Sequence, residues 1–234
     1  MRFVVCGASV KGPRHSDLEQ PNQDAMLLTG WDDGWLAAVG DGLGSRPHSD
    51  IGSCKACQSV RQVFRNTSQS IDLNTALQMI HEQWLAAISP FSVSDAATTL
   101  LLANVNNIGE VKAAQLGDGL ILVRSGGLFQ CISPDREGYG NQTSALEAIH
   151  RPDKWLEHLC TLTHFGDGIV LMTDGIADDL DPACLSEFMD TLFCVFSKRN
   201  KRTSRKWLQK QLENWATPMH SDDKSLVAIF RTSK

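Results

Sequence analysis

Short apolar runs separated by turn residues fill much of the chain, and they predict many strands. The runs at residues 3–8, 25–28 and 35–39 each have the length of a strand. Asp32-Asp33-Gly34 lies between the second and third runs, and its composition is typical of a tight turn. We therefore expect these two strands to pair. Residues 11–23 contain Gly12, Pro13 and Pro21 and predict a long loop.

The middle of the chain continues this pattern. Four short apolar runs are separated by Asn and Gly dipeptides, which predicts an antiparallel meander; the runs are residues 97–105, 111–116, 120–123 and 128–132. Gly166-Asp167-Gly168 lies between the apolar residues 159–162 and 169–173 and predicts a further hairpin. Residues 225–230 predict a last strand.

Four other segments repeat apolar residues at helical spacing and predict helices in two pairs. The first helix would be capped by Ser49 and continue to Phe64, and the second would run from Leu77 until Pro90 stops it. The second pair covers residues 185–196 and 207–215. Many antiparallel strands with helices in pairs favour an α+β layered fold over a doubly wound one.

Composition narrows the function classes. The 234 residues contain no linker-like stretch, so we expect a single domain, 1–234. A net charge of −5 disfavours a polyanionic partner, although the basic cluster at residues 198–206 keeps nucleic-acid binding as a minor hypothesis. No apolar run is long enough to cross a membrane. Seven cysteines without framework spacing indicate a reducing compartment, and we expect a cytoplasmic protein.

The Asp-Gly dipeptides divide into two groups by their position relative to the apolar runs. Asp33 and Asp167 precede such runs, as hairpin turns do, and we interpret them as structural. Asp41 and Asp174 follow buried runs and would lie where strands leave the core. Asp118 lies between two runs and fits a turn as well as a ligand.

Aspartates that converge from separate strands require a counter-charge. Two carboxylates about 4 Å apart repel by roughly 4 kcal/mol at an effective dielectric constant near 20. A divalent cation would offset this repulsion. Carboxylate ligands without a histidine or cysteine cluster suit hard ions such as Mg²⁺ or Mn²⁺ and disfavour zinc.

An ordered series of short motifs resembles one family. The series spans residues 22–225 and consists of Asn22-Gln23-Asp24, Asp41-Gly42-Leu43-Gly44, Ala97-Thr98-Thr99, Gly117-Asp118-Gly119, Thr173-Asp174-Gly175 and Asp222-Asp223-Lys224-Ser225. In order and rough spacing these motifs are similar to those of the metal-dependent type 2C protein serine/threonine phosphatases.

The resemblance implies a fold and a reaction. The fold would be a four-layer α-β-β-α sandwich with two central antiparallel sheets. Two Mn²⁺ or Mg²⁺ ions, with a third at a looser site, would lie at one edge. A water activated by the metals would attack phosphoserine or phosphothreonine in line, without a covalent enzyme intermediate. The partner would be a phosphoprotein, and we expect a monomer.

The resemblance also implies roles for individual residues. Asp41 would bridge both ions, and the Gly42 carbonyl would bind one of them. Asp174 and Asp222 would hold the other ion. Asp118 would join Asp174 at the third site. Asp24 would orient the bridging water.

Two departures from the family pattern affect catalysis. Leu43 stands where many members have a histidine proposed as general acid, and Glu19 stands where the family has a phosphate-binding arginine. Arg14, His15 and Arg46 lie near the expected site in sequence and are candidates for substrate binding. A structural or solvated role is the plainer interpretation of each. The alternative function is therefore a catalytically weak or inactive phosphatase-fold module that binds a phosphoprotein.

Overall fold

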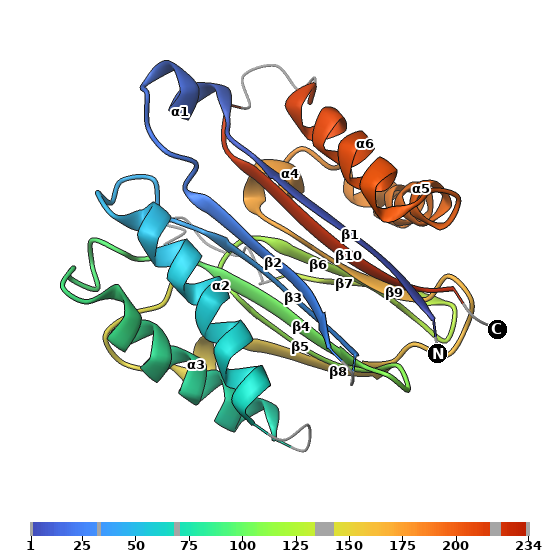
Figure 1. The fold of residues 1–234 in the computed structure, drawn as a ribbon, viewed down its shortest axis with the longest axis horizontal. Coiled ribbons are helices and arrows are strands. Elements are labelled where there is room, and N and C mark those ends of the chain that lie inside the picture. The colour runs from blue at the N-terminus through green and yellow to red at the C-terminus, as the bar shows by residue number, and fades with distance from the viewer. Residues whose placement is uncertain (1, 32–33, 68–70, 134–142, 216–220, 233–234) are drawn as a thin grey trace.

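Two five-stranded antiparallel sheets stack face to face in a computed structural model of the protein, and pairs of helices cover their outer faces (Figure 1). The structure describes residues 2–31, 34–67, 71–133, 143–215 and 221–232. The predicted α+β fold with two central antiparallel sheets is confirmed. Among the helices of these residues, none is both long and apolar enough to span a bilayer.

The first sheet has the strand order β1-β10-β9-β6-β7. Its strands are β1 (Phe3–Val10), β10 (Lys224–Arg231), β9 (Gly168–Met172), β6 (Leu120–Ser125) and β7 (Leu128–Ile132). Because β10 lies between β1 and β9, the last strand of the chain is inserted beside the first one. Both termini of the described chain therefore belong to this sheet.

The second sheet has the strand order β2-β3-β4-β5-β8. Its strands are β2 (Asp24–Trp31), β3 (Gly34–Asp41), β4 (Leu100–Asn106), β5 (Glu110–Leu116) and β8 (Leu156–Thr161). The predicted pairing of the second and third strands is confirmed, with Asp24 opposite Asp41 in the register.

Side-chain alternation along β3 shows how the layers are joined. Leu36 and Ala38 face the helices α2 (Ser49–Asn66) and α3 (Leu73–Ile88), whereas Ala37 and Val39 belong to the core between the sheets. Neighbouring residues of a strand point to opposite faces, so a strand buried on both faces is apolar throughout. The apolar run at residues 35–39 is explained by this burial.

The helices α5 (Leu185–Ser197) and α6 (Lys201–Glu213) cover the other sheet (Figure 1). Their buried Met189, Phe196 and Leu208 pack with Val170 of β9 and Ala228 of β10. Short helical segments complete the fold. They are α1 (Pro13–Asp17), α4 (Asp174–Ala177) and the 3-10 turns η1 (Pro152–Lys154) and η2 (Pro182–Cys184).

Two of the predicted hairpins are wrong. The segment at Gly117-Asp118-Gly119 connects β5 in one sheet to β6 in the other, so the meander is divided into two pairs. Gly166-Asp167-Gly168 likewise lies between β8 and β9, which belong to different sheets. Asp167 is buried and accepts backbone hydrogen bonds from residues 126, 127, 163 and 164. It is a structural residue, but it does not form a hairpin turn.

Two local predictions need smaller corrections. Ser49 is the first residue of α2 rather than its cap, and its hydroxyl donates to the carbonyl of Arg46. The expected loop at residues 11–23 contains α1, because Pro13 occupies the first helical position, where its fixed φ is favourable. For the polar stretch at residues 133–143 the sequence leaves open a substrate-facing flap or a mobile loop, and its residues 134–142 lie outside the described chain.

Candidate metal centre

Four aspartates from remote parts of the chain lie at one end of the sandwich. Asp24 begins β2 and Asp41 ends β3, so their pairing in the register sets the two side by side. Asp174 begins α4 directly after β9, and Asp222 precedes β10, the neighbour of β9. The ends of two strand pairs, one from each sheet, thus deliver the four residues to a common edge.

The connection between the sheets brings a fifth aspartate. One carboxylate oxygen each from Asp41, Asp118 and Asp174 lies within 4.8 Å of the others, so the three could bind a single metal ion. Asp118 also accepts a hydrogen bond of 2.6 Å from the Thr143 hydroxyl. A turn, which the sequence neighbours of Asp118 also allowed, does not account for this convergence with Asp41 and Asp174.

The backbone around Asp41 is held by two threonines that directly precede β4. The Asp41 N–H donates to the Thr99 hydroxyl at 3.0 Å, and the Asp41 carbonyl accepts from the Thr98 hydroxyl at 2.9 Å. Gly42 follows, where a Cβ would lie 2.4 Å from the Ser49 carbonyl oxygen. Only glycine fits there, and α2 therefore packs directly against the end of β3.

Asp24 is buried and only half satisfied. Its Oδ2 accepts a hydrogen bond of 2.8 Å from the Thr173 hydroxyl, which itself accepts from the Ser225 N–H. Its Oδ1 has no hydrogen-bond partner among the described residues, and neither has the buried Oε1 of the adjacent Gln23. Buried polar atoms are nearly always paired, so the Oδ1 of Asp24 needs a donor, which a metal-bound water or the buried Ser225 hydroxyl would supply; this hydroxyl also lowers the pKa of Asp24.

Burial and mutual repulsion disfavour ionisation of these carboxyls. Burial, followed by the charges of Asp24 and Asp174, raises the pKa of Asp41 well above its ordinary value. Burial also raises the pKa of Asp24, although the Thr173 hydroxyl acts in the opposite direction. Burial together with the charges of Asp118 and Asp222 raises the pKa of Asp174 to about 6. A divalent cation would reverse these shifts because it stabilises the ionised form of every neighbour.

The donor set therefore fits hard divalent cations. All donors are oxygens, and no His or Cys belongs to the group of potential ligands found among the described residues.

These aspartates line a cleft of about 210 Å³ with several of the candidate substrate-binding residues. Arg14 and His15 both contribute to its wall, the former exposed and the latter buried. Arg46 is exposed and is not part of the wall. Leu43 does line the cleft and places an apolar side chain in it.

Asp223 was not assigned a role from the sequence. Its carboxylate is buried and accepts hydrogen bonds from the backbone N–H groups of Gly12 and Gln23, and it contacts the His15 ring. Its three partners are 200 or more residues away in the chain, so no local pattern could have identified them.

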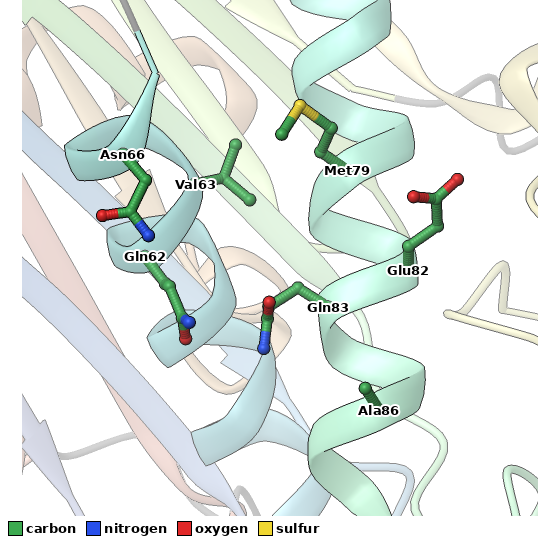
Figure 2. Close-up of a pocket in the computed structure, with 7 residues that line it drawn as sticks. All are labelled: Gln62, Val63, Asn66, Met79, Glu82, Gln83 and Ala86. Carbon is green, nitrogen blue, oxygen red and sulfur yellow. The ribbon is translucent and has the colours of Figure 1, made fainter.

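A second hollow, of about 250 Å³, lies between α2 and α3 on the outer surface (Figure 2). Among the residues that line it, amide side chains such as Gln62 and Gln83 dominate and only Glu82 is charged. A single carboxylate does not form a metal centre, so the cleft at the sandwich edge is the candidate active site.

Two stacked antiparallel sheets with an acidic cleft at one edge match the fold expected of the phosphatase family. The sequence model of the protein phosphatase 2C family matches residues 11–214, and the chain belongs to this family. Its family and fold support a metal-dependent protein phosphatase. No curated protein matches the chain by sequence.

Several solved structures share the fold at low sequence identity. PppA, a key regulatory component of T6SS in Pseudomonas aeruginosa, is 19% identical with a TM-score of 0.68, and 98% of each chain is covered. A bacterial serine phosphatase is 15% identical with a TM-score of 0.69 over 100% of both chains. RsbX in complex with magnesium is 13% identical with a TM-score of 0.60, covering 97% of this chain and 94% of the other.

Proposed function

We propose that this protein is a serine/threonine phosphatase that uses two Mn²⁺ or Mg²⁺ ions to hydrolyse phosphoserine and phosphothreonine in a phosphoprotein. The observation that carries the proposal is the convergence of Asp41, Asp118 and Asp174 beside the unpaired Oδ1 of Asp24. The ions would be held by Asp41, Asp174 and Asp222, with the Gly42 carbonyl, and a third would use Asp118. Bound ions of this kind activate water and neutralise phosphoryl charge.

The side chains of the cleft would act on the attacking water and the substrate. The Oδ1 of Asp24 would accept a hydrogen bond from the water, and the bond from Thr173 to Oδ2 would keep the carboxylate in place. The water oxygen forms the new bond to phosphorus while the bond from phosphorus to the serine or threonine oxygen breaks. The leaving oxygen then takes a proton, which gives a free hydroxyl and inorganic phosphate.

Arg14 is the exposed cation of the cleft wall and would attract the phosphorylated segment to the cleft. Leu43 has no proton to give, so the proton for the leaving oxygen would come from water or from another group of the wall. The phosphatase function thus depends on the acidic cluster and does not require a residue at position 43 that donates protons.

Hydrolysis assays test the proposal. Purified protein with Mn²⁺ should release phosphate from p-nitrophenyl phosphate and from a phosphothreonine peptide. Excess chelator and the Asp41→Ala substitution should each abolish the release, whereas the exposed Glu157→Gln of β8 should leave it unchanged. Release that survives chelator and Asp41→Ala would exclude this mechanism.

Leu43 in the cleft wall favours a second candidate, a catalytically weak module that binds a phosphoprotein. Calorimetry would then show tight Mn²⁺ binding by a protein that hydrolyses no phosphopeptide. Robust turnover would exclude this candidate.

A further inference from the structure

The buried carboxylate of Asp223 joins three segments at the wall of the cleft. Its Oδ1 accepts the Gly12 N–H and its Oδ2 accepts the Gln23 N–H, each at 2.6 Å. The Nδ1 of His15 lies 2.8 Å from the same Oδ2, with 2% of the Asp223 side chain exposed. Three donors suffice to stabilise a buried carboxylate. They also fix the start of α1 and the start of β2 against the segment that carries Asp222.

The His15 ring is held in one orientation by this contact. The residue is 5% exposed and yet lines the cleft. With Nδ1 engaged by Asp223, Nε2 is the polar atom that remains, and no described residue forms a hydrogen bond with it. At Gly12, a Cβ would lie 2.3 Å from the Ser221 carbonyl oxygen, so the backbone before α1 is tightly packed beside Asp222. The ring position is therefore set relative to the acidic cluster.

A purely structural role does not account for the rest of the cleft wall. A ring that only satisfied Asp223 would not need to face the cleft. The neighbouring Gln23 also lines this wall, but its unpaired buried Oε1 is an acceptor that calls for a donor such as water and does not bind a phosphoryl oxygen. Arg14, the cation beside it, is exposed and would lose side-chain entropy on binding, whereas the ring of His15 is already ordered.

We propose that His15 binds an oxygen of the substrate's phosphoryl group through Nε2, and that Asp223 is the positioning residue that orients its ring. The imidazolium form has two N–H donors, of which one serves Asp223 and the other the phosphoryl oxygen. This inference rests on the proposed phosphatase function for the identity of the substrate. It assigns the recognition of the phosphoryl anion to a preorganised His–Asp pair of the cleft wall.

Two substitutions of His15 separate substrate binding from structure. In His15→Asn the amide nitrogen lies near the position of Nδ1, so the contact with Asp223 is retained and the donor toward the cleft is lost. In His15→Gln the longer amide reaches the position of Nε2. The probe is inorganic phosphate, titrated calorimetrically into the Mn²⁺-loaded protein, together with KM for p-nitrophenyl phosphate. His164→Asn is the matched control, since His164 is exposed and lies beyond the opposite end of β9.

We expect His15→Asn to weaken phosphate binding and raise KM by roughly 10- to 100-fold, as for the loss of one charge-assisted hydrogen bond. Its Mn²⁺ affinity and Tm should match the wild type, and His15→Gln should recover part of the phosphate affinity. Wild-type phosphate affinity in His15→Asn would overturn the inference. A wild-type protein that binds no phosphate would also overturn it. So would a His15→Gln variant that binds phosphate more weakly than His15→Asn and has a lower Tm.

The same measurements distinguish this inference from the proposed function. If the wild type hydrolyses no phosphoester but its phosphate binding depends on His15 as described, the phosphatase proposal fails and the binding role of His15 stands. If the wild type turns over and His15→Asn has an unchanged KM, the phosphatase proposal stands and the role of His15 is refuted.

Discussion

Replacing Asp174 by asparagine should stabilise the metal-free protein. The pKa of this carboxyl is raised from 3.8 to about 6 in the folded state. A raised pKa means that the folded state disfavours the ionised form, so ionised Asp174 reduces stability. A shift of about 2 units corresponds to about 3 kcal/mol. Asparagine keeps the shape of the side chain and removes the charge, so Asp174→Asn should gain most of this free energy.

The sign of the effect fixes its pH dependence. Below the unfolded pKa near 3.8 the carboxyl is protonated in both states and has no penalty. The penalty grows as the pH rises from about 4 to 6 and is complete above pH 6. The gain of Asp174→Asn should be about 3 kcal/mol at pH 7.5 and about 1 kcal/mol at pH 4.5. At pH 7.5 this corresponds to a rise in Tm of about 6–12 °C.

Urea denaturation with excess chelator at both pH values measures the effect, with Glu157→Gln as the control for loss of an exposed carboxylate. Adding Mn²⁺ should reverse the order of stabilities. At 1,000 times its Kd, Mn²⁺ stabilises the wild type by about 4.1 kcal/mol, which exceeds the variant's advantage of about 3 kcal/mol, and the variant has lost one of the metal's ligands. A variant that is less stable than the wild type in chelator at pH 7.5, or equally stabilised at both pH values, would refute the reasoning.

Three further substitutions have defined outcomes. Burial alone would raise the pKa of Asp167, but four backbone N–H donors lower it. Asp167→Asn should therefore lose about 3 kcal/mol of unfolding free energy in urea at pH 7. The difference between variant and wild type should close as the pH falls below about 4. Gly42→Ala places a Cβ 2.4 Å from the Ser49 carbonyl, and calorimetry should show weakened Mn²⁺ binding with a stability loss of about 1–3 kcal/mol. Thr173→Val removes the donor to Asp24, and should cost about 1–3 kcal/mol and lower kcat in the phosphopeptide assay, whereas unchanged kcat would contradict the orienting role of Asp24.

Local pattern was sufficient for the elements but not for their assignment to sheets. The apolar runs predicted most strands and three of the four main helices to within a few residues, whereas α6 begins at Lys201, six residues before its predicted start at residue 207. Turn composition also predicted the pairing of β2 with β3. It failed at Gly117-Asp118-Gly119 and at Gly166-Asp167-Gly168, because glycine allows a sharp change of direction whether the next strand pairs or crosses to the other sheet. The local sequence therefore does not determine whether the next strand stays in the same sheet.

The site was predictable only in part for a related reason. The position of Asp41 and Asp174 at strand exits was visible in the sequence, and the structure brings the two together. The neighbours of Asp118 fit a turn as well as a ligand, and only the family resemblance favoured the ligand. The contacts of Asp223 and Thr173 join residues that are far apart in the chain, and only the folded arrangement identifies them.

The antiparallel pairing of the first and last strands has a practical consequence. Phe3 lies opposite Arg231, whereas Val10 lies opposite Lys224 beside the acidic cleft. Eight residues of strand, about 25 Å, separate these two ends of the sheet. A fluorescent reporter or an immobilisation tag attached through Phe3 or Arg231 would therefore lie at the end of the sandwich opposite the cleft, so a tethered form of this protein keeps the cleft accessible.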